Sequence, residues 1–101
     1  MKEHYYAVIF TSTQTTQTEG YAEMAEAMEK LAKLQPGYVG FESAREDLGI
    51  TISYWESLDD IKNWKANLDH LTAQEQGREQ WYSWYKVRIC KVEREYEFAK
   101  K

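Results

Sequence analysis

The segment 4–11, HYYAVIFT, most constrains the fold, because it is predicted to be a β-strand that is apolar on both faces. Aromatic and β-branched residues fill it, and it contains neither Gly nor Pro. A strand with one face in solvent usually alternates apolar and polar residues. The segment therefore predicts a sheet that is covered on both sides. One face would carry Tyr5, Ala7 and Ile9, and the other Tyr6, Val8 and Phe10.

The clearest helix is Gly20–Gln35, where apolar residues recur every three or four positions and charged residues fill the other side. Pro36 and Gly37 are expected to end it. The preceding stretch Thr11–Thr18 is of low complexity and is expected to be a connecting loop, at most with a ragged extension of the strand. The buried side of the helix would consist of Tyr21, Met24, Ala25, Met28, Leu31 and Ala32.

Residues 38–46 and 50–56 are expected to form a hairpin around the turn Asp47–Gly49. A second helix is expected to begin at Ser57–Asp60, which has the spacing of a capping box with Asp in place of Glu or Gln. This helix could break near residue 69 and restart toward residue 80, before a closing strand over 84–98. Its apolar stripe would consist of Ile61, Trp64, Leu68 and Leu71.

The resulting order β-α-β-β-α-β predicts an α+β, ferredoxin-like antiparallel sheet with both helices on one face. A length of 101 residues fits one domain, over residues 1–101. The other sheet face would be bare in a monomer, and a second copy is its simplest cover. We therefore expect a homodimer through the sheet faces, although a helical partner protein would also cover this face.

Composition excludes several classes of function. Thirteen basic and seventeen acidic residues give a net charge of −4, which disfavours a nucleic-acid binder. No apolar run approaches the roughly 20 residues of a membrane span, and the first residues lack a signal-peptide pattern. Cys90 is the single cysteine, so an internal disulfide and a zinc-binding CxxC pair are both excluded. We expect a cytoplasmic protein, and the absence of a glycine-rich nucleotide motif predicts no cofactor.

The segment Tyr54–Ser57, followed by Trp64 and His70, resembles the antibiotic biosynthesis monooxygenase (ABM) family, and the resemblance extends over nearly the whole chain. It implies a dimeric α+β barrel, in which two ferredoxin-like sheets pack face to face. It also implies one of several activities, since members oxidise phenolic polyketides without metal or flavin, oxidise quinol-type molecules, or degrade haem.

The haem-degrading members have an Asn on the first strand, a Trp in the second helix and a His ten residues after that Trp. Trp64 matches the Trp of this pattern, but Gln74 stands ten residues later. The end of the first strand has Thr11, Ser12 and Thr13 but no Asn. The two departures disfavour haem degradation.

Two residues are the catalytic candidates. His70 is expected to act as a general base, because histidine titrates near neutral pH. Trp64 would lie against a planar ligand, although a tryptophan on an apolar helical stripe packs by default in the core. On continuous helical spacing Asn63, Asn67, His70 and Gln74 form one polar stripe, which would otherwise be a solvated face. We assign substrate binding to Asn67, Gln74 and Tyr54.

These residues predict a cofactor-independent monooxygenase that acts on a small aromatic substrate of the phenol or quinol type. Such a substrate is its own reductant, so the protein need supply only an apolar pocket, a base and hydrogen-bond donors. A non-catalytic dimer that binds a small ligand or serves in stress is the alternative. Haem binding through His70 without degradation is a third hypothesis.

Overall fold

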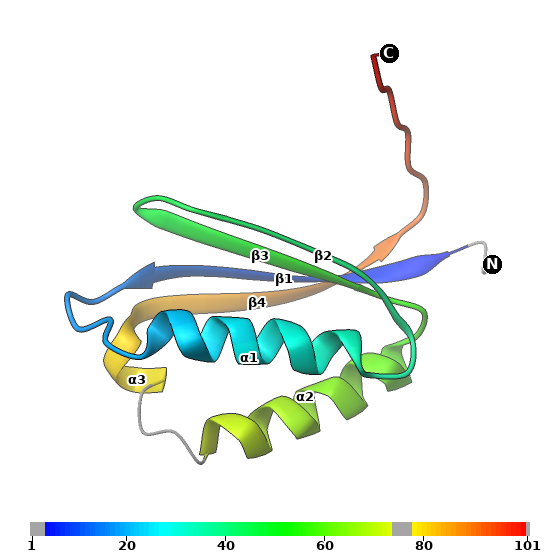
Figure 1. The fold of residues 1–101 in the computed structure, drawn as a ribbon. Coiled ribbons are helices and arrows are strands. Elements are labelled where there is room, and N and C mark those ends of the chain that lie inside the picture. The colour runs from blue at the N-terminus through cyan, green and yellow to red at the C-terminus, as the bar shows by residue number, and fades with distance from the viewer. Residues whose placement is uncertain (1–3, 74–77, 101) are drawn as a thin grey trace.

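The computed structural model describes residues 4–73 and 78–100. Within these ranges four strands form one antiparallel sheet in the order β2-β3-β1-β4. Figure 1 shows the helices on one side of this sheet. The arrangement confirms the α+β, ferredoxin-like fold. The strands are β1 (Tyr5–Gln14), β2 (Tyr38–Arg45), β3 (Leu48–Trp55) and β4 (Tyr82–Val92), and the helices are α1 (Tyr21–Lys33), α2 (Leu58–Ala73) and the short α3 (Arg78–Trp81).

The core lies between the sheet and the two long helices. Trp55 of β3 is fully buried, and Ala32 of α1 with Ile61 and Trp64 of α2 packs around it. Tyr6 and Val8 of β1 add partly buried side chains from the sheet. The apolar stripes predicted for both helices therefore do face the sheet.

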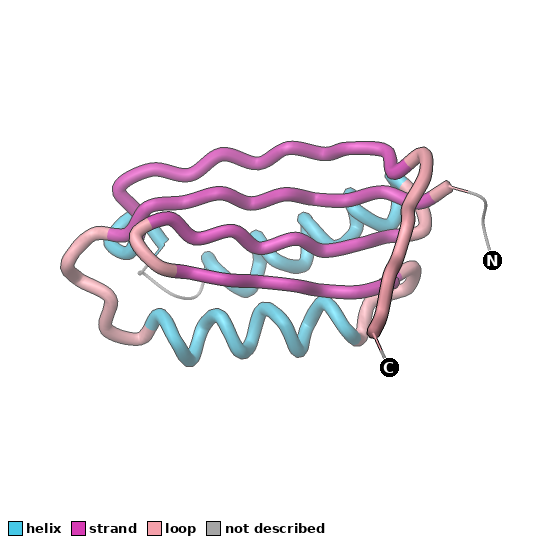
Figure 2. The backbone as a smooth tube through the Cα atoms, turned by 90° about the horizontal axis from the view of Figure 1, so that it is seen from above, coloured by secondary structure: helices cyan, strands magenta, loops and turns pink. Residues whose placement is uncertain are grey.

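The sheet face opposite the helices is here called the outer face. Figure 2 shows it from above, with the helices behind the strands and only the segment after β4 passing in front of the strand ends at one end of the sheet. Because side chains alternate along a strand, the neighbours of the core residues point to this face. Ile50 and Trp84 on it are 40% and 45% exposed. Its residues on the central strands include Tyr5, Ala7, Ile9, Ile50, Ile52 and Tyr54.

Local sequence signals explain the helix ends. Gly20 precedes α1 and Gly37 follows it, both with φ of 82°, a left-handed conformation that glycine adopts without steric cost. Ser57 caps α2, since its hydroxyl oxygen accepts a hydrogen bond from the Asp60 backbone N–H at 3.1 Å. The same hydroxyl donates to the Asp60 carboxylate at 2.7 Å. Asp60 thus occupies the N3 position of the capping box, where Glu or Gln is usual, and contacts the capping serine.

Two boundaries in the first half of the chain differ from the main prediction, although an extension of the first strand was allowed for. Strand β1 continues to Gln14, through residues assigned to a loop, because Ser12 and Thr13 pair with Gly49 and Leu48 of β3 and with the start of β4. β-Branched threonine suits an extended backbone once partner strands are present on both sides. For the same reason Leu48 belongs to β3, and the hairpin turn is shorter than predicted.

Two predictions in the second half also need correction. Helix α2 passes residue 69 and continues to Ala73, and Lys65 pairs with Asp69 one turn later at 2.7 Å. The predicted restart toward residue 80 is confirmed, because α3 begins at Arg78. Strand β4 ends at Val92 rather than at residue 98, because Val92 already pairs with Tyr5, the first residue of β1. The ladder between the two strands ends at this pair. None of the helices in the described ranges is long and apolar enough to cross a bilayer.

Candidate active site

A cleft of about 550 Å³ lies between the helix-facing side of the sheet and helices α1 and α2. This volume falls within the range of roughly 300–1,000 Å³ that small-molecule sites occupy. Its walls are mainly apolar, and β4 leaves one side open, where Val87 and Ile89 are 44% and 55% exposed. The apolar walls include Val8, Phe10, Tyr21, Met24, Met28, Phe41, Ile61, Trp64, Leu68, Trp81, Tyr82, Tyr85, Val87 and Ile89.

Aromatic rings gather at the α3 end of the cleft. Phe10 of β1 stacks on Tyr85 of β4, with ring centroids 5.3 Å apart, and meets Tyr82 edge to face at 5.4 Å. Tyr21 of α1 contacts Tyr82 and Trp81, each at right angles or nearly so. Trp81 is in turn fixed by its indole N–H, which donates to the Glu19 carbonyl at 2.8 Å. The rings form a firm wall that suits a flat apolar ligand.

Trp64 is the predicted catalytic residue that the structure brings to this cleft. It lies on α2, is 7% exposed, and belongs both to the core and to the cleft wall. Its ring stacks on Trp55, whose indole N–H donates to the Ser53 hydroxyl at 2.8 Å. This support holds the Trp64 ring in one orientation. Core packing and contact with a ligand are thus compatible at this position.

Two predicted binding residues do not line the cleft. Tyr54 is on the outer face, where its ring meets Tyr5 edge to face and its hydroxyl donates to Glu42 at 2.7 Å. Asn67 is exposed and donates to the Asn63 carbonyl at 2.9 Å and to Gln35 at 3.3 Å, between α2 and the end of α1. Neither assignment gains support from this cleft, and both stay predictions.

The remaining two candidates cannot be placed. The backbone of His70 belongs to α2, but its side chain lies outside what the structure describes, and Gln74 lies outside the described residues altogether. The assignment of His70 as a base and of Gln74 as a donor stays a prediction. Among the described residues no group of three or more His, Cys, Asp or Glu side chains could hold a metal ion.

The outer face has its own electrostatic feature. A hydrogen bond to Glu42, together with burial and the negative charge of Glu42, raises the pKa of Tyr54 to about 12. The pKa of Tyr5 is also raised, first by its hydrogen bond to Glu95 at 2.7 Å. Both tyrosines are therefore neutral hydrogen-bond donors at physiological pH, and they have no means of acting as phenolate bases.

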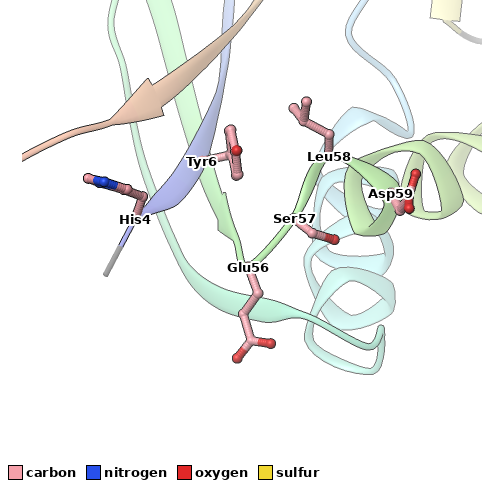
Figure 3. A pocket seen from close by; sticks show the side chains of 6 residues that line it. All are labelled: His4, Tyr6, Glu56, Ser57, Leu58 and Asp59. Atoms are coloured by element: carbon pink, nitrogen blue, oxygen red, sulfur yellow. The ribbon is translucent and has the colours of Figure 1, made fainter. Parts of the chain in front are cut away.

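A second, smaller hollow of about 260 Å³ lies beside the start of α2, below the first residues of β1. His4, Glu56 and Asp59 line it, and Figure 3 shows their charged or polar ends pointing in different directions. The Nδ1 atom of His4 is buried without a hydrogen-bond partner. The side chains do not converge on one point, so this hollow offers no arrangement for catalysis.

Sequence reasoning did not find Arg45, the last residue of β2, which lines the cleft near Tyr21. A possible signal for Arg45 was its position two residues before the predicted glycine turn, where a long cationic side chain can cross to the neighbouring strands. That signal is weak, because most arginines at strand ends extend into solvent.

Comparison with known proteins agrees with this architecture. The family model described as antibiotic biosynthesis monooxygenase (ABM) matches residues 4–76, and the chain belongs to this family. The chain is 50% identical over 93 residues to the uncharacterized protein YqjZ of Bacillus subtilis strain 168. That alignment covers 90% of this chain and 82% of YqjZ.

Two solved structures are similar in fold. SnoaB, a cofactor-independent oxygenase from Streptomyces nogalater, superposes with a TM-score of 0.63 at 17% identity, covering 87% of this chain and 91% of SnoaB. MhuD with two manganese protoporphyrin IX molecules per active site superposes with a TM-score of 0.69 at 15% identity, covering 92% of this chain and 99% of MhuD. At such low identity these similarities show the fold alone.

Proposed function

We propose that this chain is a cofactor-independent monooxygenase that oxidises a small aromatic substrate of the phenol or quinol type. The observation that carries the proposal is the apolar cleft of about 550 Å³, walled by Trp64 and by a cluster of aromatic rings. A cleft of this kind, in a chain of the ABM family, suits a flat aromatic molecule, and its apolar walls shield the ring from water except at the open side along β4.

The reaction that fits such a site uses the substrate as the reductant. A base removes the hydroxyl proton of a quinol, and the resulting anion passes an electron to dioxygen. The two radicals then recombine, which forms a carbon–oxygen bond. In the balanced reaction quinol and dioxygen give hydroxyquinone and water, so the substrate supplies all four electrons that dioxygen takes up. The protein contributes orientation, exclusion of water and a proton acceptor.

The proposed residues follow from the sequence and from the cleft. Trp64 supplies a flat wall against the substrate ring. His70, six residues later on α2, is the proposed base, and Gln74 is a further proposed contact to substrate hydroxyls. Asn67 and Tyr54 do not line the cleft, so the ligand contacts proposed for them would lie outside it.

We further propose that two copies pack through their outer faces, in a reducing cytoplasmic setting. The half-exposed Ile50 and Trp84 support such packing, because they belong to a sheet face that is apolar on its central strands and that no helix of the described chain covers. A second copy supplies the same apolar residues in return, and a two-fold homodimer is the commonest arrangement of soluble oligomers.

The experiment is oxygen consumption with methylhydroquinone, with formation of hydroxyquinone followed by absorbance and its new oxygen traced with ¹⁸O₂. We expect wild-type protein to exceed the rate without protein and to incorporate one labelled oxygen atom. His70→Ala should lower the rate by about 100-fold, as loss of a general base does. The matched control is His4→Ala, because His4 lies beside the smaller hollow and not in the cleft.

Other outcomes separate the alternatives. A His70→Ala variant as active as wild type would remove the base assignment while leaving the oxygenase proposal intact. Wild-type protein that never exceeds the background rate would overturn the oxygenase proposal and favour the non-catalytic ligand-binding dimer. A visible absorbance band that appears on addition of hemin, without loss of the porphyrin, would favour haem binding.

A further inference from the structure

The guanidinium group of Arg45 reaches across three strands at one end of the cleft. Arg45 ends β2 and pairs with Gly49 of β3, which in turn pairs with Ser12 of β1. The side chain passes over Gly49, and its Nη2 atom donates to the hydroxyl oxygen of Ser12, which is fully buried. The guanidinium carbon lies 5.7 Å from the ring centroid of Tyr21 on α1. Strands and helix together therefore hold this cation in place.

Gly49 makes this arrangement possible. A Cβ atom at Gly49 would occupy the same space as the Nη2, Cζ and Nε atoms of Arg45. Any other residue at this position would push the guanidinium group away from Ser12. The φ of Gly49 does not require glycine, since Gly20 and Gly37 are the glycines with positive φ in the described chain. The space for Arg45 is thus a physical reason for glycine at position 49.

The charge of Arg45 has no acidic partner among the described residues. Four charged residues line the cleft, and three of them pair along their own helices: Glu26 with Lys30, Glu29 with Lys33, and Lys65 with Asp69. Arg45 makes no such ion pair in the described ranges, and its Nη1 atom is buried without a hydrogen-bond partner.

An unpaired buried donor on a charged group is costly, and proteins usually pair such groups or use them in a site. The guanidinium group lies where an apolar, aromatic-walled cleft needs a polar contact to orient its ligand.

We propose that Arg45 binds an anionic oxygen of the ligand, so that the cleft selects aromatic molecules that carry a carboxylate or a similarly acidic oxygen. The ring of the ligand lies against Phe10 and Tyr85, and its anionic group accepts a hydrogen bond from the guanidinium group. Arginine forms strong charge-assisted hydrogen bonds with such groups. This inference rests on the proposed function only in taking the cleft as the ligand site.

The test compares 2-naphthoate with 2-naphthamide, two ligands of nearly the same shape that differ in charge. Isothermal titration calorimetry at pH 7 measures both dissociation constants for each variant. We expect wild-type protein to bind the carboxylate about tenfold more tightly or better, which corresponds to about 1.4 kcal/mol. The net charge of −4 repels anions in general, so such a preference requires a local cation.

Arg45→Gln should abolish the preference for the carboxylate while the affinity for the amide changes less than about twofold. The matched control is Lys62→Gln, which removes the same charge from an exposed position on α2 outside the cleft and should keep the preference. Gly49→Ala keeps the arginine but displaces its guanidinium group, and should reduce the preference as well. If Arg45→Gln does not fold, Arg45→Lys replaces it in the test. This variant retains a positive charge and should keep part of the preference for the carboxylate.

The outcomes distinguish this inference from the proposed function. If wild-type protein binds both ligands equally, or if Arg45→Gln weakens both alike, the role of Arg45 is overturned while the cleft remains a ligand site. If neither ligand binds, the cleft itself is overturned as the site, and Arg45 with it. Oxygen consumption does not enter this measurement, so an inactive protein that prefers the carboxylate still supports the inference.

Discussion

The indole rings of Trp55 and Trp64 stack with their centroids 5.6 Å apart and their planes 25° apart. Trp55 belongs to the central sheet and is fully buried, whereas Trp64 belongs to α2 and also lines the cleft. The pair therefore joins the core of the molecule to the wall of the candidate site. A change at one ring is expected to affect both stability and ligand binding.

Replacing Trp64 tests this double role. Trp64→Ala should lower the free energy of unfolding by about 3–5 kcal/mol, because it removes a large buried side chain and leaves a cavity beneath Trp55. Trp64→Phe should cost less and keep the fold, but should weaken binding of 2-naphthamide, since it reduces the flat wall of the cleft. Urea denaturation and calorimetry measure the two effects. Trp64→Phe with unchanged ligand affinity would contradict a role of Trp64 in the site.

Ser53 supports the same pair through the indole N–H of Trp55. Ser53→Ala removes the acceptor at 2.8 Å and leaves that buried donor unpaired, which should cost about 1–3 kcal/mol of unfolding free energy. The matched control is Ser43→Ala, a serine of the same sheet that is exposed, and it should change stability by less than about 0.5 kcal/mol. Equal effects of the two variants in urea denaturation would show that the Trp55 hydrogen bond adds no stability.

The outer face can be tested by placing a charge on it. Ile50→Glu should convert the proposed dimer into a monomer, because two copies of a buried carboxylate would face an apolar surface. Light scattering at micromolar concentration measures the mass. The control is Leu34→Glu, at the end of α1, where the side chain is 80% exposed and lies away from the sheet. A monomeric wild-type protein would contradict the proposed packing.

The raised pKa of Tyr54 predicts how the stability of the protein changes at alkaline pH. Its pKa is raised from 10 to about 12 by Glu42, so the folded state favours the neutral hydroxyl. This contribution to stability is fully present below pH 10 and is lost as the pH rises from 10 toward 12. Glu42→Ala should move the ionisation of one tyrosine back toward pH 10 and reduce the alkaline loss of stability.

Absorbance at 295 nm against pH follows this tyrosine, and urea denaturation at several pH values follows stability. The control is Glu46→Ala, at the exposed hairpin turn, which should leave the tyrosine titration unchanged. An identical titration for wild type and Glu42→Ala would show that the Tyr54–Glu42 hydrogen bond does not control this pKa.

The element order and the buried side of each helix could be predicted from the sequence. Apolar residues at helical spacing in α1, among them Met24 and Ala32, are indeed buried. The capping motif at Ser57 predicted the start of α2 within one residue. Such signals are local, so they need no knowledge of the neighbouring elements.

Strand ends could not be predicted in the same way. The backbone of residues 12–14 belongs to β1 because β3 and β4 pair with it, and Val92 ends β4 because β1 begins opposite it. Pairing partners are distant in sequence, and a strand has no intrinsic length without them. The same difference applies to the site. The helical spacing around Trp64 predicted its place in the cleft wall, whereas nothing local to β2 predicted that Arg45 reaches Ser12 on β1.

By itself the sequence determined a sheet with two apolar faces, two amphipathic helices to cover one of them, and membership of the ABM family. These features depend on residue type and spacing along the chain, so they can be recognised without knowing which elements become neighbours. Only the tertiary structure decided which aromatic rings wall the cleft and that Arg45 crosses over Gly49 to Ser12. Those contacts join residues far apart in the sequence, such as Phe10 with Tyr85 and Ser12 with Arg45, and only strand register and helix packing bring them together.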